Sequence, residues 1–217
     1  MDHARDHVDP REYIQKEKAV KKAIAFFDFD GTITTKDTLL EFIRFTKGNL
    51  RFYFGFLLNS PYLLAFKAGL IPNQTAKEKV LHYFFNNEDE KVFMQRCRSF
   101  AKNRLPSLIR QGALEEIRKL KEKDIPVVVV SASPECWIQP WADEQKIHLI
   151  ASRLEVDNGK ITGRLIGKNC HGKEKVKRIL EQHTMKDYEE IYAYGDSSGD
   201  RPMLELATHS FYKPFRK

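Results

Sequence analysis

Two aspartates, spaced two residues apart, follow the first apolar run of this 217-residue chain. The run, Ala23 to Phe27, is short and aromatic and ends in turn residues, which is typical of a buried strand. Asp28 and Asp30 come next, followed by Gly31 and Thr32. A carboxylate at such a strand end can attack phosphorus and form an aspartyl-phosphate, which splits one difficult hydrolysis into two displacements. The second carboxylate can then act as proton donor and acceptor.

This chemistry needs a cation, because two carboxylates would otherwise repel an approaching phosphate. Mg²⁺ suits the position, since it prefers oxygen ligands and commonly binds one or two carboxylates together with phosphate and water. Gly31 allows a tight turn, and the Thr32 hydroxyl can orient a neighbouring group. An Asp-rich turn with no chemical role would explain the same residues, so the evidence must come from the other strand ends.

A pair of hydroxyl groups follows the strongest strand signal of the chain, Ile125 to Val130. Ser131, Ala132 and Ser133 come directly after it, and a helix is expected to begin at Pro134. A hydroxyl at the carboxyl end of a buried parallel strand is placed to hydrogen-bond an oxyanion, and the amides of the next helix can do the same. Ser133 could also cap that helix, and both roles are compatible.

Two later motifs carry cationic and acidic side chains. Lys173 and Lys175 open a predicted helix, where a cation opposes the helix dipole, so a bound anion would explain them. A solvent-facing basic turn is the alternative. The last apolar run, Ile191 to Tyr194, is followed by Asp196 and Asp200 among glycines and serines. These carboxylates could complete an oxygen cage for Mg²⁺ or form an ordinary turn.

Alternating elements must position these motifs. Apolar runs alternate with amphipathic segments such as Gln111 to Lys123, which predicts an α/β fold with a parallel sheet. Parallel sheets bind ligands at the carboxyl edge of their strands, where all four motifs fall. Leu149 to Val156 and Lys160 to Leu165 flank Asp157-Asn158-Gly159, which predicts a hairpin.

A block at residues 38–110 interrupts this alternation directly after the first strand. Its pattern predicts four helices, near Thr38 to Thr46, Leu50 to Ala68, Asn73 to Phe85 and Asp89 to Asn103. The block holds 12 Lys or Arg against 5 Asp or Glu, so its excess of +7 equals the formal net charge of the chain. Charge concentrated on one module favours an anionic partner, although solvated helix faces are the commoner cause of basic runs.

The apolar run Phe52 to Phe66 within this block is rich in aromatic residues. It is uncharged for 15 residues between Arg51 and Lys67 and contains Pro61. A spanning helix needs roughly 20 apolar residues, so we expect this run not to cross a bilayer. It could pack inside a helical bundle, line a lipid-binding cleft or lie in a membrane surface.

Composition bounds the remaining possibilities. An apolar content of 41% is enough for one sizeable core with a smaller satellite domain. Cys97, Cys136 and Cys170 lie far apart, which argues against a zinc cluster or a disulfide framework and favours a reducing compartment. The first twenty residues lack the apolar region of a signal peptide, and a short helix is expected from Asp9 to Val20.

The order of the four motifs, Asp-x-Asp, Ser, Lys and Gly-Asp-x₃-Asp, resembles that of the haloacid dehalogenase superfamily of phosphohydrolases. The likeness runs from about Lys22 to Phe215, and the helical insertion resembles the type 1 cap of subfamily IB. Three longer motifs resemble one branch of this superfamily, which contains phosphoserine-phosphatase-like proteins and a bacterial phosphatidylglycerophosphate phosphatase. These motifs are Ser-Ala-Ser-Pro, Cys-x-Gly-x-x-Lys-Val and Tyr-Gly-Asp-Ser-x-x-Asp-x-Pro-Met-Leu. The resemblance implies a Rossmann-like three-layer core at 21–37 and 111–217, an α-helical cap at 38–110 and an N-terminal extension at 1–20.

The resemblance also implies a role for each acidic residue. Asp28 would be the nucleophile and Asp30 the general acid and base. Mg²⁺ would be bound by Asp28, the Asp30 carbonyl and Asp196, with Asp200 behind them.

For the phosphate, the resemblance implies Ser131 with Ala132 and one lysine. The Gly-x-x-Lys-Val pattern selects Lys175, which we favour, whereas alignment to phosphoserine phosphatases selects Lys173. Thr32 and Asp37 are further candidates for substrate binding. Phosphoserine phosphatases have a Glu nine residues after the nucleophile to bind the substrate ammonium, and this chain has the shorter Asp37 there.

We therefore predict a cytoplasmic, Mg²⁺-dependent phosphomonoesterase that works through an aspartyl-phosphate. Its substrate would be a small-molecule or lipid phosphate such as phosphatidylglycerophosphate, and phosphoserine is the alternative. A catalytically silent module that binds membranes or other anions is an alternative of another class, against which the full set of motifs argues. The basic cap favours peripheral contact with an anionic membrane at its inner face, and no nucleic acid partner is expected.

Overall fold

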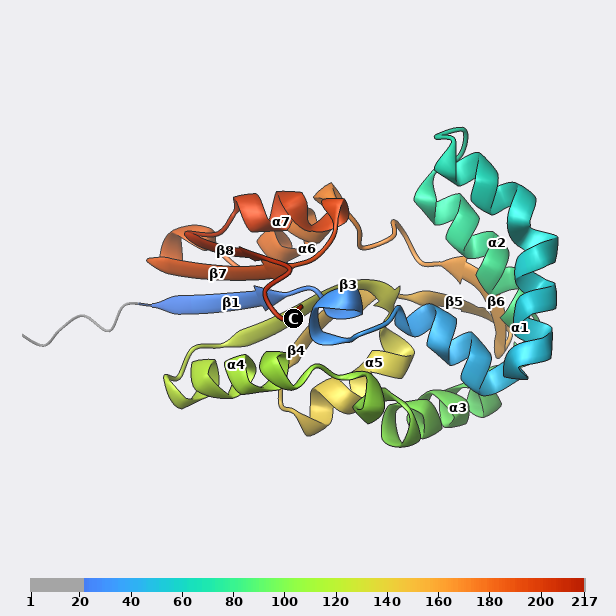
Figure 1. Ribbon diagram of the computed structural model, residues 1–217, viewed down its shortest axis with the longest axis horizontal. Helices are drawn as coiled ribbons and strands as arrows, with labels where there is room; N and C mark the ends of the chain where they lie inside the picture. The colour runs from blue at the N-terminus through green and yellow to red at the C-terminus, as the bar shows by residue number, and fades with distance from the viewer. Residues whose placement is uncertain (1–21, 217) are drawn as a thin grey trace, which may run out of the picture.

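The computed structural model describes residues 22–216, and its centre is a five-stranded parallel sheet (Figure 1). The strand order is β4-β3-β1-β7-β8. Every neighbouring pair in this order is parallel. The strands are β1 (Ala23–Phe27), β3 (Val127–Pro134), β4 (His148–Ser152), β7 (Glu190–Gly195) and β8 (His209–Tyr212).

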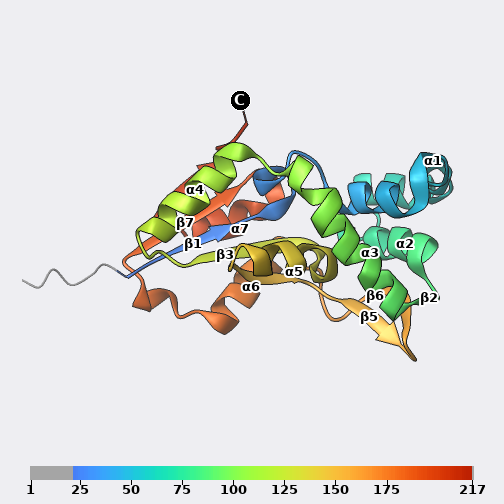
Figure 2. The same cartoon turned by 90° about the horizontal axis from the view of Figure 1, so that it is seen from below.

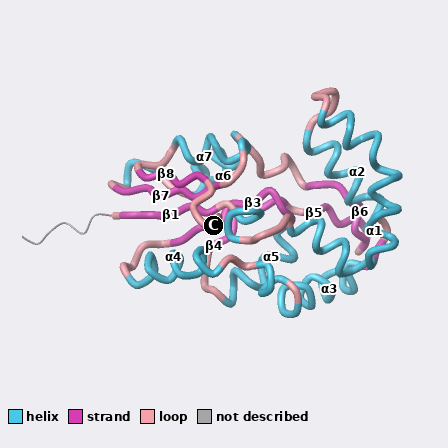
Figure 3. Tube along the Cα trace, viewed as in Figure 1, coloured by secondary structure: helices cyan, strands magenta, loops and turns pink. Residues whose placement is uncertain are grey.

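Helices cover both faces of this sheet, as Figures 1 and 3 show. One face carries α4 (Gln111–Glu122) and α5 (Glu135–Glu144), and the other carries α6 (Lys173–Gln182) and α7 (Arg201–Glu205). Strand β1 is fully buried because its successive side chains enter two different cores. The predicted three-layer α/β core is confirmed.

The insertion after β1 is helical, as predicted. It contains α1 (Thr38–Lys67), α2 (Asn73–Phe85) and α3 (Glu90–Asn103), with the two-residue strand β2 (Glu88–Asp89) between the last two. Helix α1 bends at Gly48, where φ is 76° and ψ is 165°. A positive φ is readily available only to glycine, so this residue separates α1 into the two helical pieces that the sequence pattern indicated.

The segment predicted as one strand, Leu149 to Val156, is divided between two sheets. Strand β4 belongs to the central sheet, whereas β5 (Leu154–Asp157) pairs antiparallel with β6 (Lys160–Leu165). Strand β6 also pairs with β2 of the insertion, so the hairpin joins a second, three-stranded sheet. At Gly163 a Cβ atom would lie 2.3 Å from the His82 Cα, which shows how closely the hairpin approaches α2. The break at Arg153 was missed because the sequence from Leu149 to Val156 contains no Gly, Pro, Asn or Asp to mark a turn.

The remaining differences lie at element ends. Strand β3 begins two residues later than predicted and runs on through Ser131 to Pro134, with a register shift between these two residues. Strand β8 was missed because all four of its residues are exposed at the edge of the sheet. The helix and the absent signal peptide expected within residues 1–20 lie outside the described residues. Short helical turns occupy Phe29–Ile33, Leu105–Leu108, Met185–Asp187 and Ser198–Asp200.

No helix within residues 22–216 combines the length and the apolar character needed to cross a bilayer.

Candidate active site

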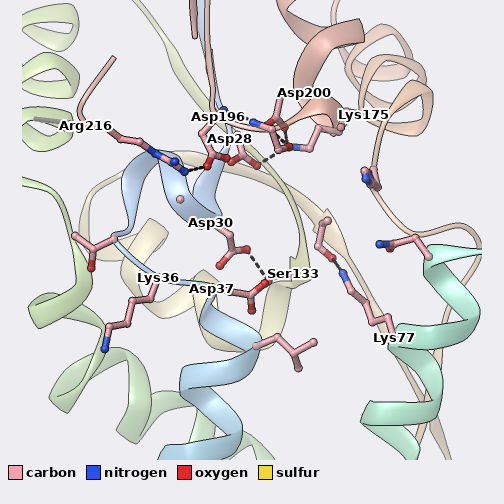
Figure 4. A pocket seen from close by; sticks show the side chains of 18 residues that line it. Asp28, Asp30, Lys36, Asp37, Lys77, Ser133, Lys175, Asp196, Asp200 and Arg216 are labelled. Carbon is pink, nitrogen blue, oxygen red and sulfur yellow. Dashed lines mark hydrogen bonds and ion pairs between the residues drawn. The ribbon is translucent and has the colours of Figure 1, made fainter. Parts of the chain in front are cut away.

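A cavity of about 450 Å³ lies between the carboxyl edge of the central sheet and the helical insertion. Figure 4 shows that side chains from both parts point into it. Its charged lining comprises Asp28, Asp30, Lys36, Asp37, Lys77, His171, Lys175, Asp196, Asp200 and Arg216. The parallel sheet has therefore gathered motifs that are up to 170 residues apart in the sequence, as the strand-edge argument predicts.

Asp28 directly follows β1 and is held by two side chains. Its Oδ1 accepts a hydrogen bond from Lys175 Nζ at 2.5 Å, and its Oδ2 accepts one from Thr32 Oγ1 at 3.0 Å. Burial raises the pKa of Asp28 to about 7, although the Lys175 ammonium opposes this effect. A buried carboxylate with raised basicity is a stronger nucleophile than an exposed one, provided that a cation keeps it ionised.

Lys175 links Asp28 to a second buried carboxylate, Asp200. The lysine Nζ lies 2.7 Å from Asp200 Oδ1, and the Lys175 side chain is 3% exposed. Burial lowers the pKa of Lys175, but the charges of Asp28 and Asp200 outweigh it and raise the pKa overall. The ammonium therefore stays charged at the point where a phosphoryl group would meet Asp28.

Asp200 is anchored by the turn that follows β7. Its Oδ2 accepts hydrogen bonds from the backbone N–H of Asp196 at 3.2 Å, and from the N–H and hydroxyl of Ser197 at 2.9 and 2.7 Å. Burial raises the pKa of Asp200, but Lys175 and these hydrogen bonds lower it below the ordinary value. This carboxylate is thus ionised and saturated with donors, which suits a residue that positions Lys175.

Asp28, Asp196 and Asp200 each place a carboxylate oxygen within 4.8 Å of the others, a grouping that fits a divalent metal ion. Lys175 and Arg216 are the cations that contact this group, so three negative charges face two positive charges. The surplus negative charge and the all-oxygen donor set suit a hard cation. Gly31 supports the arrangement, because a Cβ atom there would lie 2.4 Å from Asp196 Oδ2.

The Asp30 side chain turns away from the three clustered carboxylates, as Figure 4 shows. Its Oδ1 accepts a hydrogen bond from the first amide of α1, Thr38 N–H, at 2.6 Å. Its Oδ2 accepts one from Ser133 Oγ at 2.6 Å. The Asp30 carboxylate therefore lies outside the cluster of Asp28, Asp196 and Asp200. This position suits a carboxylate that transfers protons. Any contact of this residue with a metal would be left to its carbonyl oxygen.

A model of haloacid dehalogenase-like hydrolases matches residues 25–205, which includes all four strand-end motifs. The chain belongs to this family. The sequence-based assignment to the haloacid dehalogenase hydrolases, and hence to enzymes, is confirmed.

Similar proteins agree with this assignment. Protein CicA of Caulobacter vibrioides is 36% identical over 194 residues, covering 88% of this chain and 85% of CicA. A probable phosphatase of Mycobacterium tuberculosis is 31% identical over 202 residues, covering 87% of this chain and 68% of that protein. A substrate-bound phosphoserine phosphatase structure superposes with a TM-score of 0.60 at 22% identity, covering 88% of this chain and 85% of that one.

The structure separates the two candidate lysines of this haloacid dehalogenase-like chain. Lys175 is 2% exposed and contacts Asp28, whereas Lys173 is exposed at the first position of α6 and lines a neighbouring hollow. The side chain at the first position points away from the sheet edge, and the one two residues later points into it. Gly172, with a φ of 60°, sets this orientation at the start of the helix.

The two serines in the last part of β3 occupy different places. Ser131 is fully buried, donates to Asp30 Oδ2 at 3.4 Å and accepts from the Ser133 N–H at 3.0 Å. Ser133 and Ala132 line the cavity. The structure thus brings Ser131 next to Asp30 and exposes the following two residues to a ligand.

Asp37 lines the cavity and also caps α1, because its Oδ1 accepts a hydrogen bond from Leu40 N–H at 3.1 Å. Asp37 is exposed where it lines the cavity. Partial loss of water around it in this cleft, together with the charge of Asp30, raises the pKa of Asp37 to about 6.

Besides Lys36, sequence reasoning missed two cations that line this site. Lys77 of α2 donates to the Ala132 carbonyl at 3.1 Å and to Asn169 Oδ1 at 3.2 Å, and burial lowers its pKa. Arg216 forms an ion pair with Asp196 from the far end of the described chain. Neither belongs to a strand-end motif. An amphipathic helix that follows the sheet edge could have suggested Lys77, but nothing in the sequence indicates Arg216.

Proposed function

We propose that this protein is a Mg²⁺-dependent phosphomonoesterase that passes the phosphoryl group through Asp28. The observation that carries the proposal is the buried Asp28–Lys175–Asp200 triad beside Asp196. A binding protein gains nothing from such an arrangement, because holding two buried carboxylates and a half-buried third together is unfavourable without a cation or a reaction that uses them. The 31% identity to a probable phosphatase supports the same reaction class.

The proposed reaction has two displacements. An Asp28 oxygen attacks phosphorus and the bond from phosphorus to the leaving oxygen breaks, while Asp30 gives that oxygen a proton. In the second step a water attacks the same phosphorus, Asp30 takes a proton from the water, and the bond to Asp28 breaks to release phosphate. Thr32 and Lys175 fix the nucleophile, and the Lys175 ammonium also balances charge on the phosphoryl oxygens.

Mg²⁺ would be held by Asp28, Asp196 and the Asp30 carbonyl, where it would neutralise the charge that develops on the phosphoryl group. The three clustered carboxylates are the structural support for this choice. Asp200 already accepts four hydrogen bonds, so its part would be to hold Lys175 and the metal-side turn in place.

For the substrate, we propose a phosphomonoester whose leaving group is itself anionic, such as the lipid phosphatidylglycerophosphate. Lys77 supports this choice because its ammonium lines the cavity, and no carboxylate among residues 22–216 forms an ion pair with it. Lys36 and Arg216 add positive charge around the same cavity. A negative group on the leaving side would find partners there.

Phosphoserine is the second candidate, and one observation favours it. Asp37 and Lys77 both line the cavity and interact electrostatically, so together they could bind an ammonium and a carboxylate. The fold similarity to a phosphoserine phosphatase agrees with this alternative. Asp37 is shorter than the Glu of phosphoserine phosphatases, which is why we rank phosphoserine second.

The experiment that tests the proposal compares wild type with Asp28→Asn on phosphatidylglycerophosphate in mixed micelles, phosphoserine and p-nitrophenyl phosphate. Loss of the nucleophile should lower kcat by about 10⁴ or more. Mass spectrometry of acid-quenched wild type should show a phosphorylated Asp28. Circular dichroism controls for folding, since Asn is nearly isosteric with Asp. A variant that keeps more than a tenth of the wild-type rate would refute the assignment, and wild type inactive on every substrate would favour a binding protein.

A further inference from the structure

The second half of α1, after Gly48, presents an unpartnered apolar face. The residues of this face, called the α1 outer face, are Leu50, Tyr53, Phe54, Leu57, Leu58 and Leu64. Tyr62 and Phe66 are also exposed, but they follow the buried residues Gly55 and Asn59 by seven positions and so lie on the side of the helix next to α2. Leu50 is 86% exposed, Leu57 68% and Leu64 65%. Single exposed apolar residues are normal on soluble proteins, but a continuous stretch over about four helical turns marks an interaction surface.

This exposure is a fixed property of the helix, because the opposite face is already committed to α2. Phe52, Gly55 and Asn59 are buried, and a Cβ atom at Gly55 would lie 2.3 Å from the Phe84 ring. The close approach at Gly55 sets the rotation of α1. Rolling the outer face inward would expose Phe52 instead, so the apolar surface can be covered only by something outside residues 22–216.

The polar groups of this half-helix are satisfied internally. The Asn59 side chain donates to the Gly55 carbonyl at 2.8 Å, and the Ser60 hydroxyl donates to the Leu57 carbonyl at 2.7 Å. Pro61 has no N–H, so it leaves the Leu57 carbonyl without its usual helical partner, and Ser60 replaces that partner. The face can therefore enter a region without water at little cost in unsatisfied hydrogen bonds.

Charge identifies the kind of partner. No Asp or Glu occurs between Glu41 and Glu78, whereas Arg51 lies near the start of the outer face and Lys67 lies after its end. Lys79 of α2 lies with its Nζ 5.3 Å from the Tyr62 ring. Arg51, Lys67 and Lys79 are exposed, and none of them forms an ion pair with a residue in the described range. An anionic surface complements this basic rim, whereas a second copy of the chain would bring two basic rims together.

We propose that the α1 outer face docks this protein on an anionic lipid bilayer, lying in the interface without crossing it. The apolar side chains would enter the boundary between headgroups and acyl chains, Tyr53 would remain at headgroup level, and the cations beside the face would meet anionic headgroups. In Figure 2, α1 lies at the outer end of the insertion, away from β1 and β7 of the central sheet. The docking surface goes beyond the proposed function, since it uses none of the catalytic residues.

Sedimentation with vesicles tests this proposal. We expect wild type to sediment with vesicles of phosphatidylglycerol and phosphatidylcholine but not with phosphatidylcholine alone, and binding should weaken as salt rises. Leu58→Glu should lower the partition coefficient about tenfold or more. The matched control is Leu180→Glu on α6, because Leu58 is 50% exposed and Leu180 is 51% exposed. Equal binding of both variants, or no binding by wild type, would overturn the proposal.

Activity assays and analytical ultracentrifugation test whether the variants are folded and whether the protein self-associates. Both variants should keep wild-type activity on p-nitrophenyl phosphate, which shows that they are folded. Analytical ultracentrifugation without lipid tests the rival occupant, and a dimer that Leu58→Glu dissociates would overturn lipid docking in favour of self-association. Asp28→Asn should bind vesicles like wild type, so a failure of the proposed reaction and a failure of docking give different results.

Discussion

Lys175→Met is expected to damage both stability and catalysis, whereas Lys173→Met is expected to change neither. The two lysines belong to the same helix, but their surroundings differ. The Lys175 side chain is 3% exposed and bridges Asp28 and Asp200, whose side chains are 9% and 2% exposed. Methionine fills much of the same volume without a charge, so the substitution isolates the loss of the ammonium.

The magnitude follows from burial. Removing one partner of a buried ion pair costs roughly 3–5 kcal/mol, because the remaining charge is left buried without a counter-ion. Solvent screening gives no substantial relief at these exposures. An exposed substitution such as Lys173→Met usually stays within about 0.5 kcal/mol. For the reaction, loss of a preorganised donor to the developing charge should lower kcat by about 10²–10³.

Urea unfolding in a chelator measures the stability effect, because the chelator removes any metal that would compensate for the lost ammonium. With an m-value of about 1–3 kcal/mol/M, the midpoint for Lys175→Met should fall by about 1 M or more. Adding Asp200→Asn should recover part of the lost stability, since one unpaired charge disappears. An unchanged midpoint for Lys175→Met, together with lost activity for Lys173→Met, would show that Lys173 is the phosphate-binding lysine.

Three further predictions concern the metal and the cavity. A chelator should abolish turnover and Mg²⁺ should restore it, whereas excess Ca²⁺ should inhibit, because it accepts more ligands and can occupy both oxygens of the nucleophile. Gly31→Ala should weaken Mg²⁺ binding in calorimetry by displacing Asp196, whereas Gly159→Ala should not, since it has a similar positive φ but open space around it. Asp37→Asn removes the charge of this side chain but should keep its cap on the first turn of α1, because an Asn oxygen can also accept the Leu40 N–H hydrogen bond. Because the Asp37 pKa is raised to about 6, the contribution of Asp37 to stability should fall as pH rises from about 4 to 6, so the stability of wild type relative to the variant should fall over this range.

The site could be predicted from the sequence where chemistry coincides with a strand end. Asp28, Asp196 and residues 131–133 at the end of β3 all follow apolar runs that are typical of buried strands, and parallel strands bring their carboxyl ends to one edge. The local pattern around each strand was therefore enough to predict that these distant residues lie close together in the fold. The helical insertion was also predictable, because Gly48 and the segment before Asn73 punctuate its periodic pattern.

Other features depend on contacts that no local pattern encodes. The break at Arg153 separates β4 from β5 because the hairpin pairs with β2, which lies more than sixty residues earlier in the chain. Lys77 and Arg216 enter the site from the insertion and from the C-terminal end, where sequence shows ordinary surface cations. The choice between Lys173 and Lys175 required the helix start at Gly172, which fixes the direction of each side chain.

Helix α1 combines two requirements that would conflict in a straight helix. Its first amide, Thr38 N–H, holds the Asp30 carboxylate at 2.6 Å, so its beginning must stay fixed relative to the sheet. Phe42 and Ile43 meet this need, because both are fully buried in the main core. The outer face after Gly48 instead has to follow an external surface. The positive φ at Gly48 changes the direction of the helix between these parts, so the outer face can be presented to a partner while Asp30 keeps its orientation.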